Sequence, residues 1–375
     1  MPHVLHILPS RRPSGSWVQL GLLTEGLHGE GYRSSVAVLS ADCDEPIAAL
    51  PCGSELHLLG SRHPFGLPAL RRFRRLVGEL KPDVLHTWSI GVARTALLAR
   101  VASFTGPVIA GVRRPASIES SLSWPGARQL LGRVDRVITN GTELTKVCAA
   151  RGLNEQCIET IPDAVQPWHD DTSREARHAE LTAMLELPEH TRLLLAVARL
   201  EHASRLKDLL WAIDLLQVIR DDVHLLLVGN GPLEDRLRRY CRQLTVDRRV
   251  HFLGCRDDVP RLLRGIDVFV APGCSVVAPW AMVQAVASGV SVVAADSAVA
   301  RETLPVEEHT RLVAKGDRAA LARAINLVLD DDEPQHAPSQ PPALAALQRH
   351  TAEAYLASYR TLYQQLLTAS RQQMR

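Results

Sequence analysis

The stretch Leu193-Leu-Leu-Ala-Val-Ala198 is an uninterrupted apolar run that ends directly before Arg199. A run of this length is typical of a strand in a parallel sheet that helices cover on both faces. Similar runs recur along the chain, and amphipathic helical patterns separate them, such as the apolar stripe between Leu67 and Leu80. This alternation of strand and helix predicts a doubly wound α/β fold.

The same pattern locates the other strands. The predicted strands of the first half are Val4–Leu8, Ser35–Leu39, Glu55–Leu59, Asp83–Thr87, Val108–Val112, Val134–Thr139 and Ile158–Ile161. Those of the second half are Leu193–Ala198, Val223–Val228, Val250–Leu253, Val268–Ala271 and Val290–Ala294.

The chain has 375 residues, which is enough for two domains of about 150 residues each. The alternation breaks near residues 165–190 and again in a stretch rich in Asp and Pro after residue 330. We expect an N-terminal domain at 1–165, a connection at 166–190, a C-terminal domain at 191–330, a linker at 331–342 and a C-terminal helix at 343–375. Ligands of such folds bind beyond the carboxyl ends of the strands, so a cleft between the domains is the expected site.

Composition argues against several classes of protein. The 43 basic and 41 acidic residues give a net charge of +2, and aromatic residues make up 4%, so no nucleic-acid partner is expected. The seven cysteines include no C-x-x-C pair, which argues against zinc and redox motifs. The N-terminus lacks a basic segment typical of a signal peptide, and no apolar run is long enough to span a membrane. We therefore expect a cytoplasmic protein.

A series of motifs in the second half occurs in a characteristic order. They are Val197–Leu200, Val228–Pro232, His251–Gly254, Asp267–Pro272, Ala285–Val293 and Arg311–Asp317. In this order they resemble the nucleotide-sugar-binding domain of family-4 glycosyltransferases with the GT-B fold. The first half is similar more loosely, through Pro13–Ser16, Pro82–His86 and Ile161–Val165.

The resemblance implies two Rossmann-like domains that face each other across a cleft, with the donor bound by the C-terminal domain and the acceptor by the N-terminal one. It implies transfer of a hexose-type sugar from a UDP- or GDP-sugar, with retention of the anomeric configuration. The nucleotide sugar is a co-substrate, and neither a cofactor nor a metal is implied. Polysaccharide, lipid-linked and small-molecule acceptors all agree with the resemblance.

Such a transfer needs fixed cations that stabilise the departing nucleoside diphosphate. The family's Arg after the first strand of this domain matches Arg199, which makes it the first catalytic candidate. The family's second cation, a Lys five residues later, falls on Ser204; Arg205 or Lys207 could replace it, or be solvated surface charges. Two glycines of the second motif are further donor-site candidates: Gly229 and Gly231. They do not form the G-x-G-x-x-G fingerprint that an NAD-dependent oxidoreductase would need.

The family's Glu-x7-Glu motif is altered in this chain. Its first Glu, which binds sugar hydroxyls in the family, falls on Val276, and its second, which holds the ribose, falls on Gln284. Gln284 can still form hydrogen bonds to a ribose, whereas Val276 cannot replace a carboxylate that contributes about 1.5–3 kcal/mol. The alternative function is therefore a catalytically impaired homologue that binds a nucleotide or carbohydrate, or serves in assembly.

The first half offers candidates for the acceptor side. Gly15 matches one glycine of the family's Gly-rich loop, although a plain turn explains it equally well. His86 ends a strand and would face the cleft, unless it is a structural histidine. Arg113 and Arg114 follow the fifth strand, where many relatives carry a His that contacts the sugar; they could meet an anionic acceptor or the diphosphate, or lie on the surface.

Two further signals have alternative interpretations. Arg71, Arg72, Arg74 and Arg75 crowd one helix opposite its apolar stripe, so this helix could contact the anionic inner face of a membrane or simply be solvated. Asp42-Cys-Asp44 has the spacing of a metal-binding motif. It lies on an early loop away from the expected donor side, so no metal site is expected.

Overall fold

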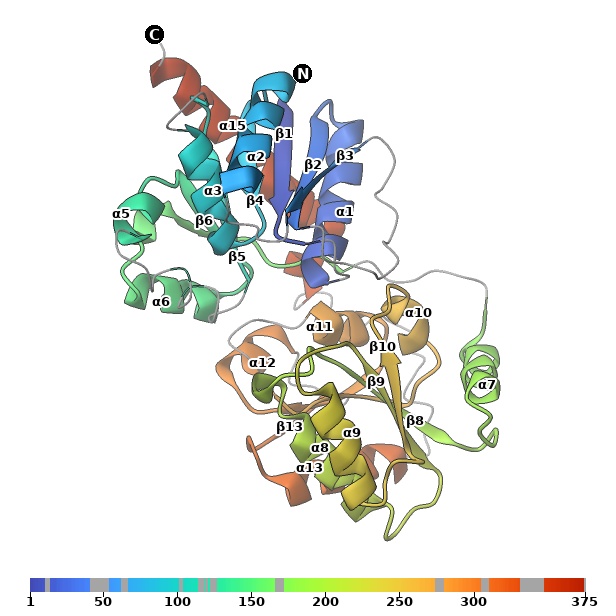
Figure 1. Ribbon diagram of the computed structural model, residues 1–375. Helices are drawn as coiled ribbons and strands as arrows, with labels where there is room; N and C mark the ends of the chain where they lie inside the picture. The colour runs from blue at the N-terminus through green and yellow to red at the C-terminus, as the bar shows by residue number, and fades with distance from the viewer. Residues whose placement is uncertain are drawn as a thin grey trace. The chain divides into compact units, whose positions relative to one another are not determined.

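The computed structural model describes residues 1–10, 14–40, 54–61, 67–100, 104–113, 118, 121, 127–165, 172–273, 280–304, 310–330 and 347–373. The chain forms two compact units (Figure 1). The first unit consists of Met1–Ala164 together with Arg349–Arg375, and the second of Val165–Gln348.

The first unit is built on a seven-stranded parallel sheet with the order β3-β2-β1-β4-β5-β6-β7. Its strands are β1 (His3–Leu8), β2 (Arg33–Ser40), β3 (Glu55–Ser61), β4 (Val84–Thr87), β5 (Val108–Val112), β6 (Arg136–Thr139) and β7 (Ile158–Thr160). Its helices include α1 (Gly15–Gly29), α2 (Leu67–Leu80), α3 (Ile90–Arg100), α5 (Ala127–Leu131) and α6 (Thr142–Ala150). The strand order reverses between β1 and β4, as a doubly wound fold requires.

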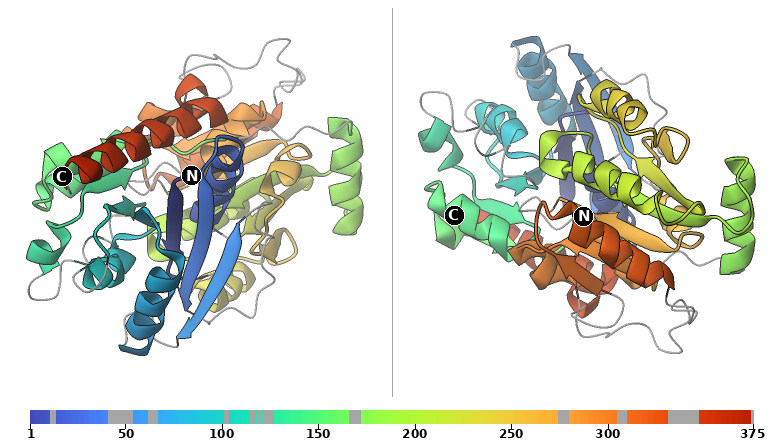
Figure 2. Two further views of the ribbon diagram at one scale, coloured as in Figure 1. Left: turned by 90° about the horizontal axis from the view of Figure 1, so that it is seen from above. Right: turned by 90° about the horizontal axis from the view of Figure 1, so that it is seen from below.

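The sequence predicted a C-terminal helix at 343–375; the structure has helix α15 (Ala352–Gln373), which belongs to the first unit. It lies beside α1 (Figure 2). Gly26 of α1 permits this close packing, because a Cβ atom there would overlap the side chain of Leu356. Tyr355, Tyr359 and Tyr363 of α15 are at most 1% exposed in the same apolar core as α1 and the sheet.

The second unit is built on a six-stranded parallel sheet with the order β10-β9-β8-β11-β12-β13. Its strands are β8 (Arg192–Val197), β9 (Val223–Val228), β10 (Val250–Gly254), β11 (Val268–Ala271), β12 (Ser291–Ala295) and β13 (Thr310–Val313). Its helices include α7 (Arg174–Met184), α8 (Leu206–Leu216), α9 (Glu234–Gln243), α10 (Val259–Leu263), α11 (Trp280–Ala287), α12 (Ala298–Thr303) and α13 (Arg318–Asp330).

Helix α7 occupies the region that the sequence suggested as a connection at 166–190. Arg174 forms an ion pair of 2.9 Å with Asp267, and His178 Nδ1 lies 2.8 Å from the carbonyl oxygen of Gly265. Leu181 joins the apolar core of the second unit. Because the sequence around α7 is rich in Pro, Asp and His, this helix was not predicted, although it packs as part of the second unit.

Strand β13 was not predicted from the sequence. All four of its residues are only half-buried, because the strand forms an edge of the sheet. An edge strand lacks the continuous apolar run by which the central strands were recognised. The predicted linker at 331–342 lies outside the described residues.

Candidate functional site

The carboxyl edge of the six-stranded sheet gathers the loops that carry most donor-site candidates. All neighbouring strands in this sheet run parallel, so their carboxyl ends lie at one edge. The loop after β8 begins at Ala198, the loop after β9 at Gly229, and the loop after β11 at Pro272. Residues from separate sequence motifs therefore meet where doubly wound sheets bind their ligands.

Gly229 and Gly231 allow two of these loops to pack backbone against backbone. Gly229 has a φ of +128°, and a Cβ atom there would overlap the carbonyl oxygen of Ala198. A Cβ atom at Gly231 would lie 2.5 Å from the carbonyl oxygen of Leu200. The Leu200 amide donates to the Asn230 carbonyl at 2.9 Å, which fastens the two loops together. Loop packing thus explains both glycines, and a direct contact with a donor stays a prediction.

Arg199 extends from this fastened loop and is accessible to a ligand. Its side chain is 42% exposed, and its Nε lies 3.2 Å from a carboxylate oxygen of Glu201. Ser204, which stands where the family has its second cation, donates its hydroxyl hydrogen to the Arg199 carbonyl at 2.6 Å. Ser204 therefore stabilises the turn, while the guanidinium of Arg199 is paired only at an exposed surface, where such pairs are weak.

Arg205 immediately precedes α8, and its guanidinium forms an ion pair with Asp208. The distance from its terminal nitrogen to Asp208 Oδ2 is 2.5 Å. The backbone of Arg205 is left-handed, with a φ of +49°. A second arginine, Arg318 at the start of α13, donates from Nε to Asp208 Oδ1 at 2.8 Å. Asp208 is thus a buried carboxylate with two guanidinium partners.

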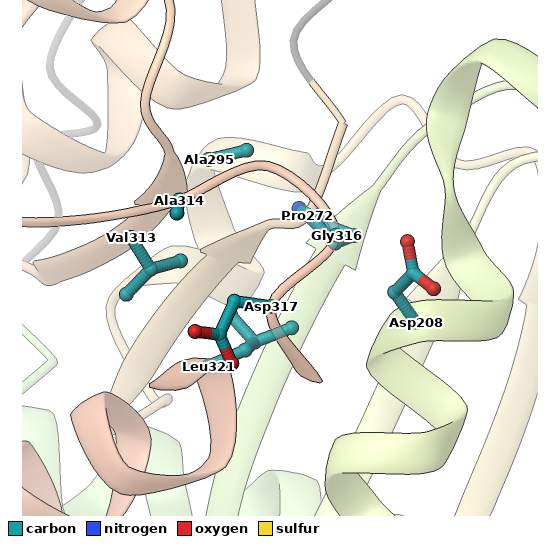
Figure 3. A pocket seen from close by; sticks show the side chains of 8 residues that line it. All are labelled: Asp208, Pro272, Ala295, Val313, Ala314, Gly316, Asp317 and Leu321. Atoms are coloured by element: carbon teal, nitrogen blue, oxygen red, sulfur yellow. The ribbon is translucent and has the colours of Figure 1, made fainter. Parts of the chain in front are cut away.

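A small pocket adjoins this cluster at the ends of β11, β12 and β13. Asp208, Pro272, Ala295 and Gly316 are among the residues that line it. Figure 3 shows Asp208 on α8 beside the loop that carries Gly316. The pocket therefore brings α8 together with loops from the other half of the sheet.

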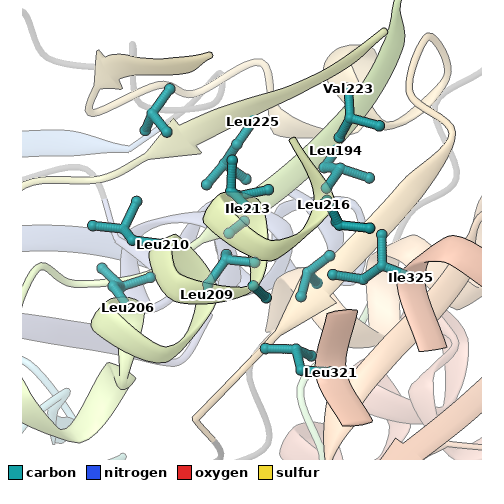
Figure 4. Close-up of a cluster of buried hydrophobic side chains, with 14 of the residues drawn as sticks. Leu194, Leu206, Leu209, Leu210, Ile213, Leu216, Val223, Leu225, Leu321 and Ile325 are labelled. Carbon is teal, nitrogen blue, oxygen red and sulfur yellow. The ribbon is translucent and has the colours of Figure 1, made fainter. Parts of the chain in front are cut away.

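An apolar core holds α8 in place beneath these charges (Figure 4). Leu206, Leu209, Leu210 and Ile213 are at most 2% exposed and pack against the sheet and α13. Their spacing of three and four residues places them on one side of the helix. The first turn of α8 is consequently rigid, and Asp208 has a fixed position relative to the strand ends.

Lys207 and Gln284 are engaged within the second unit. The ammonium of Lys207 lies 5.0 Å from the centre of the Tyr240 ring on α9, a cation–π contact. Gln284 lies on α11 and is fully buried. Their predicted donor contacts stay predictions, and Val276 lies outside the described residues.

His86 belongs to the core of the first unit, so the expectation that it faces a cleft is wrong. It is 1% exposed, its Nδ1 lies 2.7 Å from the hydroxyl oxygen of Tyr363, and its ring stacks on Trp88 at 5.0 Å. Burial holds the pKa of His86 well below its ordinary value, so the ring is neutral. Helix α15 covers this histidine. The sequence around His86 contains no signal that a helix from the C-terminal end of the chain would bury it.

Arg113 is likewise a buried structural residue and is not free to bind an anionic acceptor. Its side chain is 13% exposed, forms an ion pair with Asp163 and lies 4.9 Å from the centre of the Trp88 ring. Asp163 also accepts a hydrogen bond of 2.8 Å from Asn140 Nδ2. Burial alone would lower the pKa of Arg113, but the carboxylate of Asp163 outweighs it and raises that pKa. Arg114 lies outside the described residues.

Gly15 is the first residue of α1, where the sequence predicted a loop followed by a helix beginning near Trp17. The hydroxyl oxygen of Ser14 accepts a hydrogen bond of 3.4 Å from the Trp17 amide and caps the helix. The first turn of such a helix presents further N–H groups that have no partner within the helix. This agrees with both interpretations of Gly15, the ligand loop and the plain turn.

Among the described ranges, no group of three or more His, Cys, Asp or Glu side chains is arranged to hold a metal ion. Asp42–Asp44 falls outside those ranges. No helix in the described part of the chain is both long and apolar enough to cross a membrane.

The sequence did not single out Asp208 or Arg318. The two residues are 110 positions apart, and no spacing or motif links them. Only the packing of α8 against α13 brings them together. A buried Asp in the first turn of an amphipathic helix is the one signal that could have drawn attention to this cluster.

Comparison with solved structures defines the class of protein. The Anabaena protein HepE, solved in complex with UDP and glucose, superimposes with a TM-score of 0.78 at 17% identity; the match covers 96% of this chain and 99% of that one. Together with the two parallel sheets and their flanking helices, this likeness confirms the predicted GT-B fold.

Comparison of sequences then identifies the family. A model described as Glycosyltransferase Family 4 matches residues 13–168, and one described as Glycosyl transferases group 1 matches residues 191–331. The chain belongs to this family of glycosyltransferases.

Two characterised relatives are similar over part of their length. The phosphatidyl-myo-inositol mannosyltransferase of Mycolicibacterium smegmatis is 27% identical over 283 residues, which span 73% of this chain and 69% of the relative. The 2-deoxystreptamine glucosyltransferase of Streptomyces kanamyceticus is 27% identical over 202 residues, or 52% of each chain.

Proposed function

We propose that this protein transfers a hexose-type sugar from a UDP- or GDP-sugar to an acceptor, with retention of the anomeric configuration. Membership of the glycosyltransferase family supports a transferase. The names of the two characterised relatives, a mannosyltransferase and a glucosyltransferase, support a hexose. The acceptor is a carbohydrate or a lipid-linked molecule.

The observation that carries the proposal is the exposed guanidinium of Arg199 at the carboxyl edge of the second sheet. The loop that bears it is fixed by hydrogen bonds to Asn230 and Ser204. A cation fixed in advance at this edge stabilises a departing diphosphate without reorganisation during the reaction. Arg205 supplies the second cation in this proposal.

Replacing Arg199 by Ala is expected to weaken the binding of UDP or GDP by about 10- to 100-fold, because a hydrogen bond from a charged group to the diphosphate is lost. Calorimetric titration of the purified protein measures this affinity. Arg236→Ala, which removes an exposed arginine on α9, is the matched control and should leave the affinity unchanged. If well-folded protein binds neither nucleotide, the proposed function is wrong.

The alternative is a catalytically impaired homologue that retains a nucleotide or carbohydrate site. The full burial of Gln284, at the position of the family's second Glu, favours it. Release of UDP or GDP from a nucleotide sugar distinguishes the two functions. Tight nucleotide binding without turnover for any donor and acceptor tested would support the impaired homologue.

We also propose that α2 contacts an anionic membrane surface. Arg71, Arg74 and Arg75 are exposed along this helix, opposite the buried Phe73 and Val77. Arg72 is excluded from this surface, because its guanidinium donates to the carbonyl oxygens of Leu59 and Gly60 at 2.5 and 3.1 Å. Arg75 is paired with Glu79 at 2.8 Å, and together with Arg71 and Arg74 it lies on an exposed basic face that lipid phosphates would attract.

Replacing Arg71, Arg74 and Arg75 together by Gln is expected to weaken binding to phosphatidylglycerol vesicles by about 100-fold, since each basic residue near such a surface contributes about 1 kcal/mol. Vesicle co-sedimentation at low salt measures the change. The same substitutions at the exposed Arg236, Arg239 and Arg242 of α9 are the control. An equal loss in both triple variants would show unspecific attraction and contradict a role of α2.

A further inference from the structure

Asp208 is a buried carboxylate shared by two arginines from different segments. Its side chain is 8% exposed, and its two oxygens are bound by Arg205 and Arg318 at 2.5 and 2.8 Å. Arg318 is additionally held by Trp211, whose ring centre lies 5.3 Å from the guanidinium carbon. Because two guanidinium groups share one carboxylate, one of them can leave without stripping the buried charge of its counter-ion.

Arg205 has a donor group that its ion pair with Asp208 does not use. Its Nε is buried and has no hydrogen-bond partner among the residues that the structure describes, although a buried N–H group is costly to leave unpaired. Its φ of +49° is unfavourable for a residue with a side chain. Arg205 also depends on Gly316 for space, since a Cβ atom there would lie 2.7 Å from its terminal nitrogen.

We propose that Asp208 binds Arg205 in the absence of the donor, and that Arg318 allows Arg205 to leave Asp208 for the diphosphate when the donor binds. On binding, Arg205 exchanges the carboxylate of Asp208 for oxygens of the distal phosphate, while Arg318 keeps Asp208 paired. This inference rests on the proposed function, because the diphosphate is the anion that draws Arg205 away. Asp208 and Arg318 are positioning residues in this exchange, and neither contacts the nucleotide.

The exchange predicts opposite effects for the two positioning residues. Arg318→Met keeps the stem of the side chain but leaves Arg205 as the only partner of Asp208, so the affinity for UDP and GDP should fall about tenfold. Asp208→Asn keeps the shape but frees Arg205, so the same affinity should rise about three- to tenfold. UMP and GMP lack the distal phosphate, and their affinities should change by less than about twofold. Calorimetric titration measures all four nucleotides.

Two controls separate this exchange from a general change in electrostatic potential. Asp317→Asn removes the same charge at the same pocket, but the Asp317 carboxylate accepts from the Ala320 amide and does not touch Arg205. Its effect on UDP or GDP should be less than about twofold. In an Arg205→Met background, Arg318→Met and Asp208→Asn should both lose their effects. Thermal melting of every variant shows whether the second unit remains folded.

Several outcomes would overturn the inference. Weaker diphosphate binding by folded Asp208→Asn would show that Asp208 positions Arg205 for the ligand and does not withhold it. Effects that persist without Arg205, or that Asp317→Asn reproduces, would show simple electrostatics. If Arg199→Ala abolishes binding while the Asp208 and Arg318 variants behave as wild type, this inference fails and the proposed function stands. Wild-type protein that binds neither UDP nor GDP would overturn both.

Discussion

Asp163→Ala is expected to lower the free energy of unfolding of the first unit by about 3–5 kcal/mol, because it leaves the buried guanidinium of Arg113 without a counter-ion. Asp163 also anchors Asn140 through its carboxylate, and its carbonyl oxygen lies 2.8 Å from His350 Nδ1. The carboxylate therefore joins the ends of two strands at the point where the C-terminal segment returns. Chemical denaturation monitored by tryptophan fluorescence measures the loss, since Trp88 lies against Arg113.

The double variant Arg113→Met/Asp163→Asn is the matched control for this prediction. It removes both charges together, so no buried ion lacks a partner, and the amide can still form hydrogen bonds. Its stability should lie within about 1–2 kcal/mol of the wild type. If Asp163→Ala is as stable as the double variant, the buried ion pair is not what holds this region.

Removal of residues 348–375 is expected to unfold the first unit. This truncation exposes the core face that α15 covers with Tyr355, Tyr359, Leu362, Tyr363 and Leu366, all at most 6% exposed. Burying one such side chain contributes about 1.5–3 kcal/mol, so the five together match or exceed a typical net stability of about 5–15 kcal/mol. Differential scanning calorimetry should show the transition of the first unit lost and that of the second retained.

Two single substitutions in α15 test the same contacts without removing the helix. Tyr363→Ala should lower the free energy of unfolding by about 3–5 kcal/mol, because it opens a cavity against Tyr32 and His86. Gln365→Ala, on the exposed face of the same helix, should change it by less than about 0.5 kcal/mol. A truncated protein that retains both thermal transitions would contradict the assignment of α15 to the first unit.

These structural roles bear on how functional variants are interpreted. A loss of activity in variants of His86 or Arg113 would follow from damage to the core of the first unit, and it would not identify an acceptor site. Arg199 is 42% exposed, so its substitution tests the donor site with little change in stability.

The fold class could be predicted from the amino-acid sequence, because the signal for parallel strands is local. Leu193–Ala198 is a continuous apolar run, Val223–Val228 is interrupted only by His224, and each forms a strand within one residue of its predicted bounds. The order of motifs likewise indicated the family, and Arg199 lies in the loop that follows β8. Such features depend on residues that are neighbours in the chain.

The sequence could not indicate which charged side chains are exposed and which are buried in ion pairs. Arg199 and Arg113 each lie at the start of the loop after a strand, yet Arg199 is exposed and Arg113 is paired with Asp163, fifty residues away. From the sequence, Arg205 is either a replacement for the family's lysine or a solvated charge, whereas in the structure it shares the carboxylate of Asp208 with Arg318. His86 is covered by helix α15, whose Tyr363 contacts it although the two residues are 277 positions apart in the chain. Burial and ion pairing depend on contacts between distant segments, and folding alone brings those segments together.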